Sequence, residues 1–144
     1  MRRAAAVFVL SIVVGAACLA PSGTLFETTV TMPDGSYPMP VALRDQTGLV
    51  VAIEPALDES AAGKNLFVGP DPADPRSVLV TWFGGACDND VAMSLTRAEG
   101  IHFLFLDTHG KLGLGCPALG LTRGVAIRFS EPIPVNTIQA RLSP

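Results

Sequence analysis

The feature that most restricts the fold of this chain is a two-residue alternation of apolar and other side chains. It recurs in short runs at residues 25–32, 41–43, 49–53, 91–96, 101–106, 125–130 and 136–142. Side chains alternate between the two faces of a β-strand, so this period predicts strands. No run shows the period of an amphipathic helix, and the run 77–83 is apolar on both faces, as is typical of a central strand.

About eight short strands, with turn signals roughly every 8–12 positions, are typical of an all-β sandwich. We therefore predict one domain at residues 21–144, a small antiparallel β-sandwich of immunoglobulin-like architecture with about 7–8 strands. A small β-barrel is the alternative. The stretch 55–76 holds four prolines and has little periodicity, so we expect a long loop there, with one candidate short strand at 64–68.

The first 20 residues have the build of a bacterial secretory signal peptide. Arg2 and Arg3 precede an uncharged, mostly apolar run at 4–20, and this run ends in small residues. A permanent transmembrane helix, which needs about 20 apolar residues, is the alternative. The segment predicts export of the protein and removal of residues 1–20.

Two cleavage routes are compatible with this leader. The segment 15–18, Gly-Ala-Ala-Cys, resembles a lipobox, in which Cys18 is acylated and becomes the new N-terminus. Gly15 departs from that pattern, since leucine is usual three residues before the cysteine. Ordinary cleavage after Ala20 is the other route, and we favour the lipoprotein.

The chain contains three cysteines, an awkward number for an exported protein. If Cys18 is lipidated or removed with the leader, Cys87 and Cys116 can pair, and an oxidising compartment favours a disulfide. We predict this disulfide, with two free buried thiols as the alternative. Neither cysteine has a second cysteine or a histidine at the spacing of a zinc site.

The charge balance limits the partners. A net charge of −3 and the lack of a Lys/Arg cluster argue against nucleic-acid binding, which needs a basic footprint. Loss of Arg2 and Arg3 with the leader would leave 8 of the 10 basic residues against 13 acidic ones, a net charge of −5. Such a surface disfavours adhesion to anionic lipid, so we expect membrane contact only through a lipid on Cys18.

A specific pattern lies in the second half of the chain. It runs W-x-G-G-x-C-D from Trp82 to Asp88 and continues as C-x-A-x-G from Cys116 to Gly120. With its flanking residues, the pattern covers most of 41–135 and resembles small exported bacterial proteins of unassigned function. The resemblance implies a pair of cysteines and a β-rich secreted domain, and it brings no activity with it.

Two histidines are the candidates for general-base catalysis. His102 lies on the strand face opposite Ile101 and Phe103, and His109 lies in a predicted turn beside Asp107. Catalysis of this kind needs a nucleophile within reach of the histidine, and no G-x-S-x-G run is present. We interpret both histidines as surface or half-buried residues and predict no catalytic residue. An envelope hydrolase that uses one of them with Asp107 is an alternative.

Metal and cofactor signals are weak. Five oxygen-bearing residues fall in two segments: Asp71, Asp74, Asp88, Asn89 and Asp90. Calcium takes several such oxygens, but no EF-hand spacing is present, and we interpret 88–90 as a polar turn. The glycine-rich run 110–115 lacks the strand and helix of a phosphate loop, and no histidine follows Cys116 as a blue-copper site requires. We predict no metal and no cofactor.

The candidate binding residues are Leu66, Phe67 and Trp82. The first two form an apolar patch in the 55–76 loop that either is exposed or packs back onto the sheet. Trp82 shares the parity of neighbouring valines, so core packing is the alternative to an aromatic platform. Loops carry function on a rigid sandwich, and 55–76 and 108–123 are the loops we would test.

These features together predict a non-catalytic exported binding or structural domain, a cell-envelope lipoprotein without a cofactor. Its expected partner is a protein or a glycan of the cell envelope. A freely secreted or periplasmic protein is the alternative location. A secreted protease inhibitor or an envelope hydrolase is the alternative function.

Overall fold

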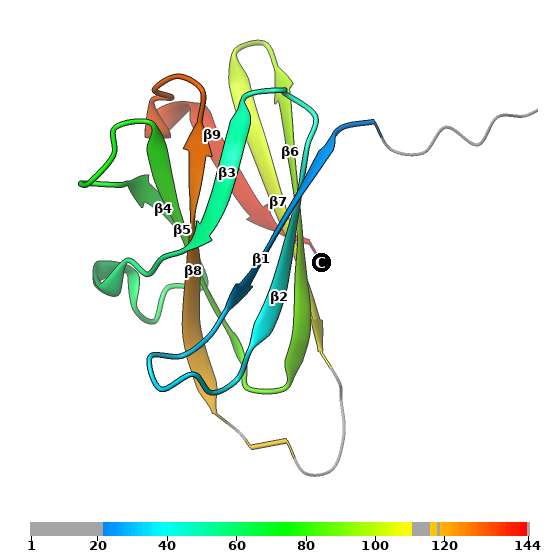
Figure 1. Ribbon diagram of the computed structural model, residues 1–144, viewed down its shortest axis with the longest axis vertical. Coiled ribbons are helices and arrows are strands. Elements are labelled where there is room, and N and C mark those ends of the chain that lie inside the picture. Colours follow the sequence, from blue (N-terminus) through cyan, green and yellow to red (C-terminus); the bar gives the residue numbers. More distant parts are fainter. Residues whose placement is uncertain (1–21, 111–115, 118, 144) are drawn as a thin grey trace, which may run out of the picture.

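The computed structural model describes residues 22–110, 116, 117 and 119–143, which form two β-sheets packed face to face (Figure 1). The described residues form nine strands and two 3-10 helices: β1 (Thr24–Val30), β2 (Met39–Asp45), β3 (Val50–Pro55), η1 (Glu59–Ala61), β4 (Leu66–Pro70), β5 (Ser77–Gly85), β6 (Asp88–Ala98), β7 (Ile101–Gly110), β8 (Gly120–Phe129), η2 (Val135–Thr137) and β9 (Ile138–Leu142). The predicted all-β sandwich is confirmed, and its strands form two open sheets instead of one closed barrel.

Two predictions fall on residues outside those described. They are the signal peptide at 1–20, with its lipidation site Cys18, and the glycine-rich run 110–115, of which Gly110 alone is described. Within the described part of the chain, no helix has the length and apolar character needed to cross a membrane.

One sheet has the strand order β1-β2-β6-β7-β9, and the other has the order β3-β8-β5-β4. Five of the seven pairings between described strands are antiparallel, whereas β2 pairs with β6 and β7 pairs with β9 in parallel. Parallel pairing of β2 with β6 follows from the chain path: after β2 the chain builds three strands of the other sheet before it returns. The five-stranded sheet is therefore mixed.

Alternate residues of the strands fill the space between the sheets. On the central strands the core residues are Met39, Val41 and Leu43 of β2, Val78, Val80 and Trp82 of β5, Val91, Met93 and Leu95 of β6, Leu104 and Leu106 of β7, and Val125, Ile127 and Phe129 of β8. These sets follow the two-residue period of the sequence. Removal of their apolar surface from water is the main stabilising term of such a fold.

Some segments expected to be turns or loops are strands. Residues 107–110 pair with residues 88–92 and extend the β6–β7 hairpin, so both segments expected to be turns are paired strand. In the stretch 55–76, the candidate short strand at 64–68 corresponds to β4 at Leu66–Pro70, which pairs with β5 and forms an edge of the four-stranded sheet. The 3-10 helix η1 also anchors it, since Ala61 is fully buried.

The predicted disulfide between Cys87 and Cys116 is confirmed, with a Cα–Cα distance of 5.8 Å. Cys87 lies in the connection from β5 to β6, and Cys116 lies in the connection from β7 to β8. Each of these connections joins a strand of one sheet to a strand of the other, and the strand ends that they join lie at the lower end of the molecule in Figure 1. The disulfide therefore fastens two crossings of the sandwich at the same end.

Candidate functional site

Arg123 is a charged residue in the interior of the sandwich. It lies on β8 opposite Trp82 of β5, and it shares the inward parity of β8 with Val125 and Ile127. Only 2% of Arg123 and 0% of Trp82 is exposed to solvent. The strand alternation therefore places a guanidinium among inward positions that are otherwise apolar.

The hydrogen-bonding capacity of the Arg123 guanidinium is only partly used by its surroundings. Its Nη1 donates a hydrogen bond to the backbone carbonyl of Gly85 at 3.1 Å. Among the described residues, neither its Nε nor Nε1 of Trp82 has a hydrogen-bond partner, and both atoms are buried. Burial of unpartnered donors is costly, because they lose their hydrogen bonds to water and gain nothing in return.

No carboxylate among the described residues forms an ion pair with Arg123. The charge of Asp88 acts on it, but Asp88 Oδ2 accepts a hydrogen bond from the Gly85 N–H at 2.8 Å instead. Burial lowers the pKa of the Arg123 guanidinium, and the charge of Asp88 opposes this shift. Arginine stays protonated in proteins, so the sandwich holds a buried cation without a paired countercharge.

A pocket of about 300 Å³ opens beside Arg123, on the side of the sandwich where β3 ends. Among the described residues β3 pairs with β8 as far as Val125, whereas β8 extends back to Gly120, which leaves part of its edge uncovered. The lining residues are Val30, Thr31, Met32, Pro33, Pro55, Ala56, Leu57, Thr122, Arg123 and Gly124. Arg123 is the charged residue of this lining, and the others are apolar or neutral.

Sequence reasoning did not single out Arg123 as a site residue. The predicted strand began at residue 125, five residues after the start of β8 at Gly120. The two-residue alternation could have identified Arg123. If the inward positions Val125 and Ile127 are continued toward the N-terminus, the next inward positions are Arg123 and Leu121. A charged residue at an inward position of an apolar strand is a candidate functional residue.

The predicted binding residues are divided between the two faces of the four-stranded sheet. Leu66 pairs with Trp82, and both pack against the core. Trp82 is fully buried, as the core-packing alternative predicts. Phe67 has the opposite parity on β4, and its ring lies 4.0 Å from Nζ of Lys64. The structure therefore does not bring Phe67 and Trp82 onto one surface.

His109 lies in β7 and not in a turn, and it stands between two carboxylates. Its Nδ1 is 2.6 Å from Asp90 Oδ1, and its Nε2 is 3.2 Å from Asp107 Oδ2. The hydrogen bond with Asp90 and the charge of Asp107 raise the pKa of His109 above its ordinary value of 6.5. All three groups are on the surface, which screens the pairing.

His102 is buried, which corrects the expectation of a surface or half-buried side chain. Only 5% of it is exposed, because it has the inward parity of Leu104 on β7. Neither ring nitrogen has a hydrogen-bond partner within the described part of the chain. Burial and the charge of Arg97 lower the pKa of His102, while the Thr137 backbone and the charges of Asp45 and Glu131 oppose the shift.

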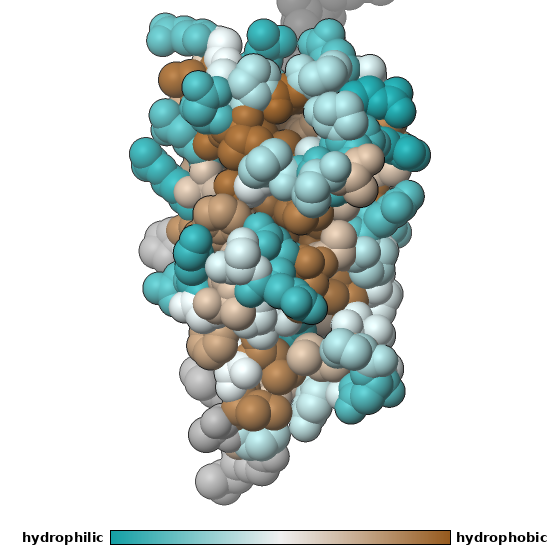
Figure 2. Space-filling model, turned by 90° about the vertical axis from the view of Figure 1, so that its left-hand side faces the viewer, coloured by the Kyte–Doolittle hydropathy of each residue, from teal (hydrophilic) through white to brown (hydrophobic). Residues whose placement is uncertain are grey.

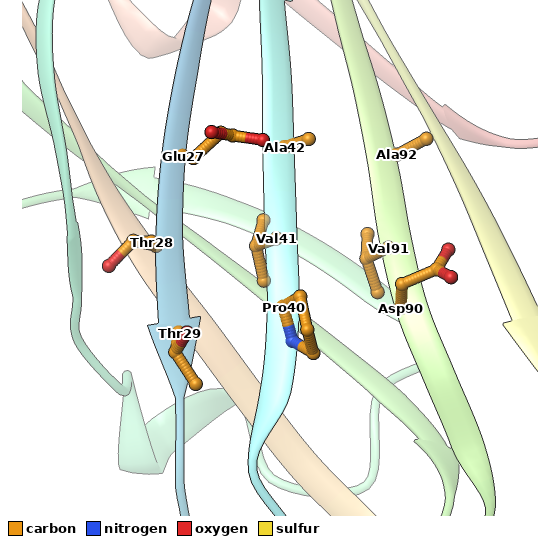
Figure 3. A pocket seen from close by; sticks show the side chains of 9 residues that line it. All are labelled: Glu27, Thr28, Thr29, Pro40, Val41, Ala42, Asp90, Val91 and Ala92. Carbon is orange, nitrogen blue, oxygen red and sulfur yellow. The ribbon is translucent and has the colours of Figure 1, made fainter.

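A shallow groove of about 550 Å³ crosses β1, β2 and β6 of the five-stranded sheet (Figure 3). Ala42 and Ala92 are neighbours in the register, and their small side chains keep the groove open. Glu27 reaches over this floor from β1, whereas Asp90 points away toward β7, where it meets His109. The acidic groups of the groove are thus solvated or paired.

Apolar surface is exposed in patches between polar side chains on the side of the molecule that carries η1 and β4 (Figure 2). The exposed large apolar residues of the described chain are Leu25, Tyr37, Val51, Leu57, Phe83, Phe105, Leu119 and Leu142. Leu57 combines 44% exposure with a place in the lining of the pocket beside Arg123. The entrance of that pocket is therefore partly apolar.

The acidic residues considered for calcium serve other partners. Asp71 accepts the N–H of Ala73 and Asp74 accepts the N–H of Arg76, both within their own loop. Among the described residues, no group of three or more histidine, cysteine or acidic side chains is placed to hold a metal ion.

No protein-family model matches the chain, and neither a curated protein nor a solved structure matches it significantly.

Proposed function

We propose that this protein is a non-catalytic exported binding domain that is held at the cell envelope by a lipid on Cys18. The observation that carries the binding role is the guanidinium of Arg123, which is buried at the wall of a pocket and has no paired countercharge in the part of the chain that the structure describes. A buried unpaired charge destabilises a fold by several kcal/mol. A ligand that brings the missing charge would remove the penalty.

The disulfide supports the export part of this proposal. Disulfides persist in oxidising compartments outside the cytosol. The leader at 1–20 supplies the route, and the lipobox-like segment 15–18 supplies the anchor. The odd number of cysteines is accounted for if Cys18 carries the lipid, since Cys87 and Cys116 form the disulfide.

The surroundings of the two histidines support a role without catalysis. Both ring nitrogens of His109 face carboxylates, so neither is free to take a proton from a nucleophile. His102 is enclosed between the sheets, where a substrate has no access. This geometry gives no support to the envelope hydrolase that the sequence left open.

The export and anchoring part is tested by the intact mass of the protein purified from a bacterial host. We expect a chain that begins at Cys18 and carries a diacylglyceryl group. The Cys18→Ala variant is the control, and it should lose the lipid mass and leave the membrane fraction. A wild-type chain that begins at Pro21 without lipid would show a free exported protein and contradict the anchor.

The binding part is tested by two-dimensional NMR with small organic probes of negative, neutral and positive charge. The amide signals of Ala56 and Gly124 report on the pocket, because both residues line it. Saturable shifts of these signals with at least one probe support a binding role. If no probe shifts them, the binding role is wrong.

A further inference from the structure

We propose that the pocket beside Arg123 binds the carboxylate of a small ligand with a short apolar body, with the Arg123 guanidinium as its positive partner. This inference rests on the proposed binding role and adds the chemistry of the ligand. Its basis is the combination of one buried cation, a partly apolar pocket and an unpartnered guanidinium Nε.

The chain itself offers no acidic side chain that fills this role. The residues outside the described ranges contain no Asp or Glu, so all 13 acidic side chains belong to the described part. None of these forms an ion pair with Arg123. Asp88, whose charge acts on Arg123, is held by the Gly85 N–H. An acidic side chain of this chain therefore does not pair with Arg123, and a ligand carboxylate can take that place.

The guanidinium favours a carboxylate over other anions. Nη1 of Arg123 is engaged with Gly85, which leaves the edge formed by Nε and Nη2 for a ligand. Such an edge matches the two oxygens of a carboxylate. A phosphate dianion would bring two charges, and the lining holds no second cation to balance them. Nε is buried, so the Arg123 side chain has to turn toward the pocket for both of these nitrogens to meet the carboxylate.

The rest of the lining fits a short apolar body. Val30, Met32 and Leu57 supply apolar surface around the guanidinium. The volume of about 300 Å³ lies at the lower end of the range for small-molecule pockets, which favours a short ligand. The exposed side chain of Leu57 gives such a ligand an apolar entrance.

The test compares three probes with the same chain length and different charge: octanoate, octanol and octylammonium. Each is titrated into the mature protein, and the amide shifts of Ala56 and Gly124 are followed by NMR. We expect octanoate to bind at least tenfold more tightly than octanol, and octylammonium to bind more weakly than octanol. The Arg123 side-chain Nε signal should shift with octanoate alone.

Two pairs of variants test whether the preference for octanoate depends on Arg123 and on the charge at the pocket entrance. Arg123→Met keeps the length of the side chain and should abolish the preference for octanoate, whereas Arg128→Met, at an exposed position of the same strand, should preserve it. Leu57→Glu and Leu57→Lys change an exposed residue and spare the core. The glutamate should weaken octanoate binding at least tenfold, and the lysine should not. If Arg123→Met does not fold, the comparison of the two Leu57 variants still tests whether the pocket prefers a negatively charged ligand.

Three results would overturn the proposal. Equal affinity for octanoate and octanol would show an apolar pocket without carboxylate recognition, and the binding role would stand. Octanoate shifts that map away from the pocket, or that survive in Arg123→Met, would remove Arg123 from the site. Failure of all three probes to shift the pocket signals would overturn both this inference and the proposed binding role.

Discussion

Loss of the disulfide should destabilise the domain by an amount that its loop length sets. The Cys87→Ser/Cys116→Ser double variant opens a loop with a sequence separation of 29 residues. The chain-entropy relation gives about 3.6 kcal/mol for such a loop. With an unfolding entropy near 2.1 cal/mol/K per residue, a domain of about 120 residues should lose roughly 14 °C in Tm. Neither sulfur is in the core, so serine should fit at both positions.

The assay is urea unfolding followed by circular dichroism, with and without a reductant. The reductant should lower the unfolding midpoint of the wild-type protein to that of the double variant, and it should leave the double variant unchanged. A loss below about 1 kcal/mol would refute the reasoning, because it would mean that the cross-link does not restrict the unfolded chain. A reductant effect on the double variant would mean that the loss has another cause.

Other substitutions test the core and the histidines. Gly124→Ala should cost about 1–3 kcal/mol in urea unfolding, because its Cβ would meet the backbone carbonyl of Ala56 and neither backbone can yield easily. Arg123→Met should raise the free energy of unfolding of the ligand-free protein by about 1–4 kcal/mol, since it replaces an unpaired buried charge with apolar surface; a less stable variant would contradict the uncompensated charge. The NMR titration midpoint of His109 should lie above 6.5, and the stability it adds should be lost as the pH rises through that midpoint. The lowered pKa of His102 means that the unfolded chain takes up its proton first, so stability should fall as the pH drops below about 6.5, and a His102→Leu variant should lack that loss.

The sequence predicts those parts of the fold that depend on local alternation. The runs at 91–96 and 101–106 predict β6 and β7, since each strand carries its own inward and outward sets. The parallel pairing of Val41 with Val91 has no local signal, because three strands of the other sheet lie between the two residues in the chain. Local patterns determine strands, whereas the pairing of strands is a property of the whole chain.

The candidate site was harder to predict than the fold. The polar hairpin end at 88–90 and 107–110 was interpreted as turns because of its composition, although its backbone is paired. The sequence offers a candidate short strand at 64–68 inside a long loop, and β4 covers Leu66–Pro70 instead, because the prolines and weak periodicity of 55–76 leave the strand bounds undefined. Arg123 was missed for a related reason: charge in a sequence suggests the surface, and only the parity of β8 places this side chain inside.

The position of the disulfide has a consequence for the order in which the domain forms. The loop between Cys87 and Cys116 encloses the β6–β7 hairpin and no other described strand. Its contacts are local, whereas β1 and β9, at the two edges of the same sheet, come from opposite ends of the described chain. Local contacts form faster than distant ones. We therefore expect the hairpin to acquire its covalent bond before the outer strands arrive, so that an oxidised hairpin becomes the template on which β2 and β9 dock in parallel.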